Sequence, residues 1–279
     1  MDSNKKSKTS KILYYGFLCL VGLTFIFPIY YTLINALRGI YSTPAILLPK
    51  GWEWINFKYA VTLIPFFKYL KNSLIIMFIS VGLGVPFNFL YGYALARVEA
   101  PGRRVIFFVV LSQMMIPGFA LQIPQYILFS NYGFQDTFWI WVLTAVGGSA
   151  GLIFLFRQYL LSMPRALEEA AIIDGCSSLQ VLTRIALPLS KPVLAIGLFT
   201  LFVANWGDYM TPYMYLTKEN YPLIMALFGL DYTLPTNPGF VLVPVKNAAV
   251  ILLMLPTMIV FFLCQKQLVE GATYSGVKG

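Results

Sequence analysis

Six long apolar blocks constrain the fold of this chain more than any other feature of its sequence. The blocks cover, to within about a residue or two, positions 12–37, 72–96, 105–129, 137–156, 192–213 and 247–264. A helix of about 20 apolar residues matches the roughly 30 Å hydrocarbon core of a bilayer. Charged residues make up only 11% of the chain, whereas a soluble domain carries about a quarter. The sequence therefore predicts an all-α membrane protein with six transmembrane helices in one domain, residues 1–279, and argues against a soluble fold.

Composition excludes several classes of function. The net charge is +9, but the basic residues lie in short segments between the blocks and form no stripe that could track phosphates, so nucleic acid is not an expected partner. Histidine, the commonest metal ligand and general base, is absent from the sequence. Cys19, Cys176 and Cys264 have unrelated spacing, so we expect no metal site and no disulfide framework. No catalytic constellation is visible, which disfavours a membrane-embedded enzyme.

The distribution of Lys and Arg indicates the direction of insertion. With a cytoplasmic N-terminus, 13 of the 20 basic residues fall in inside segments and 7 in outside segments. Basic residues favour the cytoplasmic side of a membrane. We therefore expect a multi-pass protein of a bacterial cell membrane with both termini in the cytoplasm.

The segment 157–191 differs in character from the rest of the chain. It carries seven charged residues, each of which would cost about 2.5–3.5 kcal/mol at the bilayer centre, so it is expected outside the membrane as a cytoplasmic loop. Pro164 suits the first turn of a helix, Gly175 suits its end, and Ser177 to Gln180 has the spacing of a capping box that begins a second helix. Pro188 and Pro192 are expected to close the loop before the fifth block. This pattern alone is also compatible with a plain connector.

The residues of this loop follow a known motif. Glu169-Ala170-Ala171, three residues, Gly175, nine residues and Ile185-Ala186-Leu187-Pro188 match every fixed position of E-A-A-x3-G-x9-I-x-L-P. The loop thus resembles the EAA loop of permeases in binding-protein-dependent ABC importers. The resemblance implies the type I importer permease fold.

The resemblance also implies that a short helix of this loop docks in a groove of a cytoplasmic ATPase. Small Ala side chains allow close approach, an acidic side chain can pair with a basic group of the ATPase, and Gly sets the bend. The residues expected to carry the coupling are Glu168, Glu169, Ala170, Ala171, Asp174, Gly175, Ile185, Leu187 and Pro188.

The implied partners supply what this chain lacks. The sequence has no G-x4-G-K-[ST] phosphate loop, so ATP and Mg²⁺ are expected on two ATPase subunits and no cofactor is expected on this chain. A second permease, forming a heterodimer with this chain, and an extracytoplasmic solute-binding protein complete the expected assembly, surrounded by membrane lipid.

Other segments are similar to maltose-type sugar permeases, so the resemblance covers nearly the whole chain. These segments are Asn72-Ser73, Tyr93 to Arg97, Pro101-Gly102-Arg103, Ile123-Pro124, Gly133, Thr137 and the ending Gly276 to Gly279, which looks like that of the smaller, six-span subunit. They imply a carbohydrate, an oligosaccharide, as the solute. The segment 214–246 resembles in position the external loop by which such permeases reach a docked binding protein. Asn205 to Asp208 departs from the family, which often has Trp-Asn followed by an acidic residue.

Polar and aromatic residues within the blocks are candidates for the translocation path, since an unsatisfied polar group is costly there. They are Asn88, Gln113, Gln122, Asn205, Trp206 and Asp208, of which Asp208 is the first choice. Each could equally join two helices or lie at an interface.

Two other functions stay open from the sequence. The same architecture could import another solute, such as a polyamine or an inorganic anion. An ion-coupled secondary transporter would need a coupling-ion site and usually repeated halves, and the sequence contains no such duplication.

Overall fold

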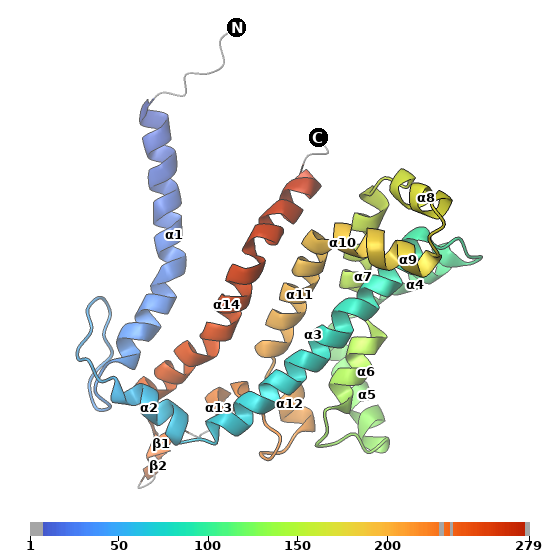
Figure 1. Ribbon diagram of the computed structural model, residues 1–279. Coiled ribbons are helices and arrows are strands. Elements are labelled where there is room, and N and C mark those ends of the chain that lie inside the picture. Colours follow the sequence, from blue (N-terminus) through green and yellow to red (C-terminus); the bar gives the residue numbers. More distant parts are fainter. Residues whose placement is uncertain (1–7, 229–231, 235–236, 277–279) are drawn as a thin grey trace. The chain divides into compact units, whose positions relative to one another are not determined.

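The computed structural model describes residues 8–228, 232–234 and 237–276, most of them in helices (Figure 1). The helices are α1 (Lys8–Ala36), α2 (Ile55–Thr62), α3 (Phe66–Arg97), α4 (Arg103–Gln113), α5 (Gly118–Asn131), α6 (Trp139–Gly147), α7 (Ala150–Ser162), α8 (Ala166–Ile173), α9 (Ser178–Val181), α10 (Leu187–Leu189), α11 (Lys191–Trp206), α12 (Met210–Tyr215), α13 (Ile224–Phe228) and α14 (Val243–Gly276). One π-helical turn, η1 (Leu182–Ala186), separates α9 from α10. Strands β1 (Thr233–Leu234) and β2 (Asn237–Val241) pair antiparallel, with Thr233 opposite Val241.

The described residues contain four helices long and apolar enough to span a membrane, or six spans if two bent pairs of helices each count as one. The four are Ser10–Ala36, Phe66–Arg97, Trp139–Ser162 and Val243–Val269. The bent pairs are Arg103–Gln113 with Gly118–Asn131, and Ser178–Leu189 with Lys191–Trp206. Each of the six apolar blocks in the sequence corresponds to one of these six segments.

The helices depart from the predicted blocks at two bends. α4 and α5 meet at 98°, and the turn contains Pro117, which lacks a backbone N–H and disfavours helical geometry in the residue before it. The helical segment before α11 meets α11 at 77° around Ser190. Proline at the second position of α11, Pro192, fits there because the first N–H groups of a helix have no partner within it.

The helices also differ from the predicted blocks in length. α7 continues to Ser162, past the expected end at 156, and α14 runs from Val243 to Gly276 rather than from 247 to 264. The fifth block, expected to reach 213, ends as α11 at Trp206, and α12 follows it. Hydropathy locates the apolar part of a helix, whereas its hydrogen bonding continues until a capping or breaking residue.

The chain divides into two compact units, residues 1–67 with 226–255 and residues 68–225 with 256–279. In the first unit, side-chain hydrogen bonds fasten α2 to segments far away in the sequence. The Asn56 amide donates to the carbonyls of Ala36 and Arg38 at 2.8 and 2.9 Å. The Tyr232 hydroxyl donates to the Ala60 carbonyl at 3.0 Å, which links α2 to the segment beside β1.

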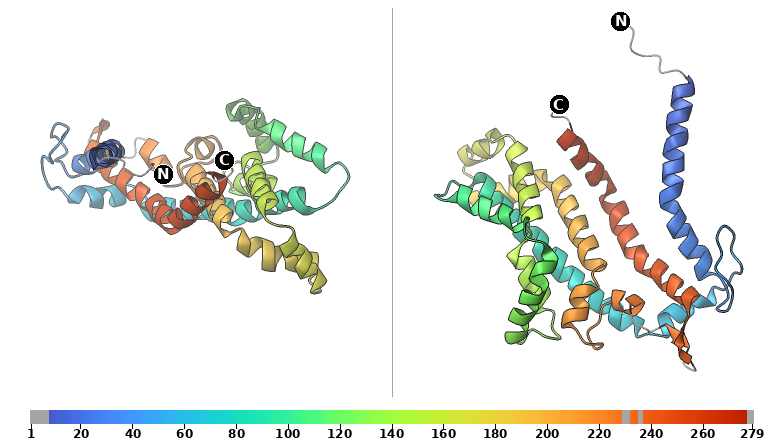
Figure 2. Two further views of the ribbon diagram at one scale, coloured as in Figure 1. Left: turned by 90° about the horizontal axis from the view of Figure 1, so that it is seen from above. Right: turned by 180° about the vertical axis from the view of Figure 1, so that it is seen from behind.

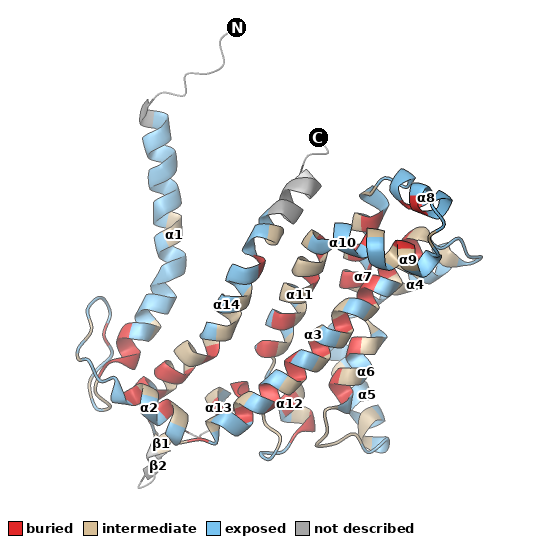
Figure 3. Ribbon diagram, in the orientation of Figure 1, coloured by how far each residue is buried: buried red, intermediate tan, exposed pale blue. Residues whose placement is uncertain are grey.

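The second unit packs around Phe156 of α7, which is fully buried. Its ring meets Phe89 of α3 edge to face, with 5.7 Å between the ring centroids. Gly92 of α3 and Gly197 of α11 lie directly against Phe156, so close that neither has room for a Cβ atom. Figure 3 shows buried positions along α3, α7 and α11, whereas the described α4 and α5 have none. Small residues therefore let three helices meet on one ring, as is common between helices in membranes.

Replacing Gly92 by Ala should destabilise the second unit, whereas the same change at Gly82 of the same helix should not. The new methyl group at position 92 would lie 2.8 Å from the Cβ of Phe156 and 3.0 Å from the backbone nitrogen of Arg157. Such overpacking costs about 1–3 kcal/mol. Among the described residues nothing lies within 4 Å of a Cβ at Gly82, where Ala should stabilise the helix by about 0.5–1 kcal/mol. Thermal unfolding of the protein in detergent measures both effects, and equal Tm values for the two variants would contradict this packing.

Candidate functional site

The first helix of the charged loop ends where its local chemistry predicts, but it begins at Ala166, two residues after Pro164, which was expected in its first turn. α8 carries Glu168 and Glu169 in its first turn, where carboxylates interact favourably with the helix dipole. Gly175 has a φ of +88°, a conformation that side chains disfavour, and its N–H donates to the carbonyl of Ile172 at 3.0 Å. The predicted helix and its end at Gly175 are confirmed.

The second helix of the loop begins with the predicted capping box. The backbone N–H of Gln180 donates to Ser177 Oγ at 3.4 Å, and the Ser177 N–H donates to Gln180 Oε1 at 2.8 Å. Two helix N–H groups thereby gain partners. The turn between α8 and α9 is thus held by its own residues.

The loop closes between Pro188 and Pro192, as the sequence predicted. Pro188 lies inside α10, and the chain turns at Ser190, two residues before Pro192. Before Pro188 the helix widens into η1, where the N–H of Leu187 donates to the carbonyl of Leu182. This wider turn lets the helix continue where Pro188 itself offers no N–H.

α8 has one buried and one exposed face. Glu168 and Ala171 are buried, while the expected coupling residues Glu169, Ala170, Asp174 and Gly175 are exposed. The large apolar side chains exposed on α8 and α9 are Leu167, Ile172, Ile173 and Leu179, of which Ile173 is 85% exposed. Of the other expected coupling residues, Leu187 and Pro188 are exposed and Ile185 is partly buried.

A buried ion pair anchors α8 to the end of α3. Arg97 Nε donates to Glu168 Oε1 at 2.7 Å, and the two side chains are only 6% and 11% exposed. Arg97 Nη2 also donates to the carbonyl of Met163 at 3.1 Å, just before α8. One guanidinium group therefore joins the last residue of α3, the end of α7 and the first turn of α8. Glu168 is consequently directed inward, and of the adjacent glutamates only Glu169 faces outward.

Two further arginines join the same region. Arg157 Nε of α7 donates to the carbonyl of Leu95 at 3.2 Å, and its guanidinium lies 3.9 Å above the ring of Phe107 in α4. Arg165, just before α8, lies 3.6 Å from Glu99, and both side chains are exposed. The rear view in Figure 2 shows α8 and the start of α4 beside the C-terminal end of α3.

The opposite end of α3 is joined to the other set of connections. Lys68 forms an ion pair with Glu219, and the N–H of Leu223 donates to Ser73 Oγ at 2.8 Å. The N–H of Thr217 donates to Asp136 Oδ1 at 2.8 Å. Partial burial alone would raise the pKa of Asp136, but hydrogen bonds from Thr217 and Asn220 outweigh it and lower that pKa. These contacts and Arg97 lie at opposite ends of a 32-residue helix, about 48 Å long.

A polar cavity of about 240 Å³ lies between α3, α6 and α11. It is lined by Ser80, Gly84, Asn88, Thr144, Ala145, Gly148, Ser149, Leu201 and Asn205. The buried Asn88 donates to the carbonyl of Gly84 at 2.7 Å and accepts from the N–H of Ser149 at 2.7 Å. Asn205 accepts a hydrogen bond from Ser80 Oγ at 3.1 Å. Two of the six predicted path residues therefore meet at one cavity, where they also join helices.

The other four predicted path residues do not line this cavity. Asp208 Oδ1 accepts from the N–H groups of Met210 and Thr211 at 3.0 and 3.2 Å, which caps the start of α12. Trp206 is buried and stacks on Phe202 with 5.4 Å between ring centroids. Gln113 is exposed at the end of α4, and Gln122 is partly buried in α5.

The sequence did not single out Arg97, Met163 or Ser149 as site residues. Arg97 counted among the basic residues that set the orientation and ended the segment Tyr93 to Arg97 that is similar to maltose-type permeases, but no partner was assigned to it. Met163 and Ser149 act through their backbone carbonyl and N–H groups, which every residue type except proline has, so the sequence cannot single them out.

Comparison with known proteins places these features in context. The family described as the binding-protein-dependent transport system inner membrane component matches residues 84–273. The maltodextrin transport system permease protein MdxG of Bacillus subtilis is 30% identical over 285 residues, covering 100% of each chain. The arabinooligosaccharides transport system permease protein AraQ of Halalkalibacterium halodurans is 30% identical over 291 residues, covering 98% of this chain and 100% of the relative. The probable starch degradation products transport system permease protein AmyC of Thermoanaerobacterium thermosulfurigenes is 30% identical over 268 residues, covering 92% and 93%.

A solved structure shares the fold. A chain of a bacterial ABC transporter involved in the import of the acidic polysaccharide alginate superposes with a TM-score of 0.80, at 24% sequence identity, covering 95% of this chain and 98% of that one. The predicted fold class, an all-α type I ABC importer permease, is confirmed.

Replacing either partner of the Arg97–Glu168 pair should detach α8 from α3. Arg97→Met leaves the Glu168 carboxylate buried without its partner, which costs about 3–5 kcal/mol. The double variant Arg97→Met/Glu168→Met should lose less stability than Arg97→Met alone, because it buries no charge. Hydrogen exchange of α8 and thermal unfolding provide the measurements. Glu99→Gln, at an exposed pair, is the matched control with an expected cost of about 0–1 kcal/mol, and an equal loss in this control would contradict the anchoring role.

Proposed function

The chain belongs to the family of binding-protein-dependent transport system inner membrane components, and we propose that it is the permease subunit of an ATP-driven importer of an oligosaccharide. The solute class is supported by the relatives named for maltodextrin, arabinooligosaccharides and starch degradation products. The importer mechanism is supported by the surface of α8. A non-sugar solute carried by the same architecture is the alternative.

The proposed coupling rests on the exposed face of α8. Leu167, Ile172 and Ile173 are apolar and exposed, while the neighbouring charges Glu169 and Asp174 exclude this face from lipid. An apolar surface that can enter neither lipid nor the core of its own chain requires a protein partner. That partner is one of two cytoplasmic ATPases, which hold the ATP and Mg²⁺, and Glu169 is positioned to meet a basic group on it.

In the proposed orientation α8 is cytoplasmic, as are both termini, in a bacterial cell membrane. The 13-to-7 distribution of basic residues supports this direction. The segments that contact the Arg97 end of α3 and those that contact its Lys68 end form two groups. An alternating six-span topology puts these two groups on opposite sides of the membrane. The group at the Lys68 end then faces the extracytoplasmic binding protein, together with the segment 214–246, part of which lies outside the described residues.

A second permease is proposed to complete the path. The cavity beside Asn88 and Asn205 is about 240 Å³, below the roughly 300–1,000 Å³ typical of sites for small ligands. An oligosaccharide therefore needs surface beyond what this chain offers in this state. Ser80, Asn88, Thr144 and Asn205 are the polar side chains we propose for this chain's side of the path. The proposed role of Gln113, Gln122, Trp206 and Asp208 there has no support from this cavity.

Replacing Gly175 by Val should uncouple ATP hydrolysis from uptake. Val at a φ of +88° strains the backbone by about 1–2 kcal/mol, and this strain should tilt α8 and reduce coupled uptake roughly 5- to 30-fold. No described atom lies within 4 Å of a Cβ at this position, so the variant should still fold and assemble. Uptake and ATPase rates of the reconstituted importer are the measurements. Gly133→Val, at a φ of +73° with equal space, is the control expected to transport normally, and normal uptake by the Gly175 variant would refute the coupling role.

The solute class can be tested through the binding protein encoded beside this chain. Purified without added ligand, then denatured, it should release an oligosaccharide that is identified by mass spectrometry. The same oligosaccharide should stimulate the ATPase activity of the reconstituted importer. Release of a polyamine or an inorganic anion instead would overturn the sugar assignment and leave the importer assignment intact.

A further inference from the structure

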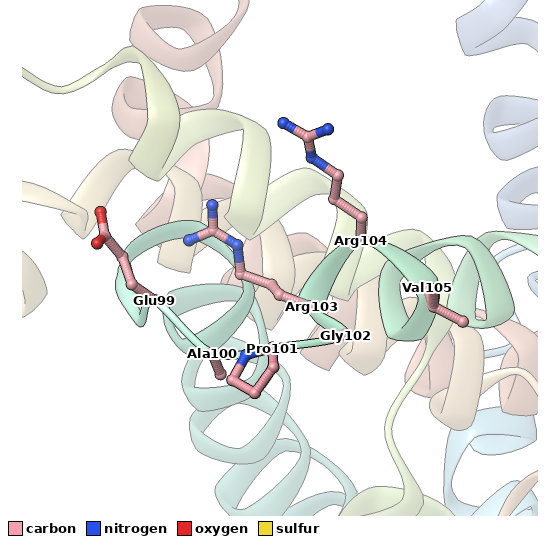
Figure 4. A pocket seen from close by; sticks show the side chains of 7 residues that line it. All are labelled: Glu99, Ala100, Pro101, Gly102, Arg103, Arg104 and Val105. Atoms are coloured by element: carbon pink, nitrogen blue, oxygen red, sulfur yellow. The ribbon is translucent and has the colours of Figure 1, made fainter.

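The turn between α3 and α4 forms a second cavity, far along α3 from the polar cavity described above. It is open, has a volume of about 580 Å³, and is lined by the consecutive residues 99–105, here called the basic turn. Figure 4 shows the Arg103 and Arg104 guanidinium groups extending to the same side of the turn as the Glu99 carboxylate. Arg103 Nη1 donates to the carbonyl of Val98 at 3.0 Å, which fixes its position at the rim.

The positive charge around the basic turn is not neutralised within the described chain. Five arginines and two glutamates gather there, and both glutamates are in ion pairs, Glu168 with Arg97 and Glu99 with Arg165. No carboxylate of the described residues lies within 4.0 Å of the three other arginines, Arg103, Arg104 and Arg157. Arg157 lies over Phe107, which is one helical turn from Arg103 and on the same face of α4. This arrangement attracts an anion.

The surface next to this charge is apolar. On α4, immediately after the two arginines, Val105, Ile106, Phe108 and Val109 are 66%, 55%, 68% and 57% exposed. A free anion such as inorganic phosphate would gain nothing from these side chains. A molecule with an anionic head and hydrocarbon chains would contact both surfaces at once.

We propose that the basic turn binds the phosphate of an anionic phospholipid whose acyl chains lie along the exposed face of α4. The turn joins a membrane-spanning helix to an apolar helix, so it lies at the depth of lipid headgroups. Basic pockets between helices at this level bind anionic headgroups, and each basic side chain near the surface strengthens such binding. The site is separate from the proposed coupling surface and path, and it does not depend on which solute is carried.

The test uses the full chain, purified in a neutral detergent and titrated with phosphatidylglycerol, with bound lipid counted by native mass spectrometry. Arg103→Gln/Arg104→Gln should weaken the binding about 30-fold. The matched control Arg184→Gln/Lys191→Gln removes the same charge from exposed positions at the same end of the second unit and should bind normally. Because Arg103 also holds the turn, Arg104→Gln alone is compared with Arg184→Gln, and a weaker but clear loss is expected in the former only.

Three results would overturn the proposal. The first is an equal loss of phosphatidylglycerol in both double variants, which would mean general attraction to positive charge. The second is unchanged binding in the Arg104 variant, or binding of phosphatidylcholine or glycerophosphoglycerol as strong as that of phosphatidylglycerol. The third is disappearance of the bound lipid when the chain assembles with its importer partners, which would assign the face of α4 to a protein.

Discussion

The ring of Phe156 is the contact on which the second unit depends. In a bilayer, association of helices gains little from the hydrophobic effect because lipid tails are as apolar as the side chains. Van der Waals contact between closely packed helices must supply the stability instead. Two glycines on different helices allow this close packing because they leave space for the ring of Phe156. Once α3, α7 and α11 meet there, Asn88 and Asn205 are brought to a common cavity. Toward the C-terminal end of α3 the same packing brings Arg97 to Met163 and Glu168.

The two ends of α3 are held by interactions of different kinds. At the Arg97 end the contact is a charge pair almost without access to water, which holds its geometry strictly because neither partner can be satisfied alone. At the Lys68 end the ion pair is exposed and the other contacts involve hydroxyl and amide groups. The buried pair is therefore a stiff connection between α8 and α3, whereas the exposed contacts at the Lys68 end constrain α3 less.

The parts of the site that depend on neighbouring residues could be predicted from the sequence. The end of α8 at Gly175 and the capping box of α9 each depend on residues within a few positions, the first through the positive φ of glycine and the second through side-chain hydrogen bonds. The capping of α12 by Asp208 is equally local, but the polarity of that residue suggested a place in the path instead. The direction of Glu168 could not be read, since its partner lies 71 residues earlier. The bend of 98° after α4 could not be predicted either, because Pro117 removes a helical hydrogen bond without setting the new direction of the chain.

The division of α8 into a buried and an exposed face has a consequence for how such a protein can evolve. The buried residues of the helix, Glu168 and Ala171, are not the exposed ones that we propose to meet an ATPase. Under this proposal Ile172, Ile173 and Glu169 can change under selection for a different ATPase while the attachment to α3 is preserved. Gene duplication followed by few substitutions on a single helical turn would then yield permeases that share one architecture and use different ATPases.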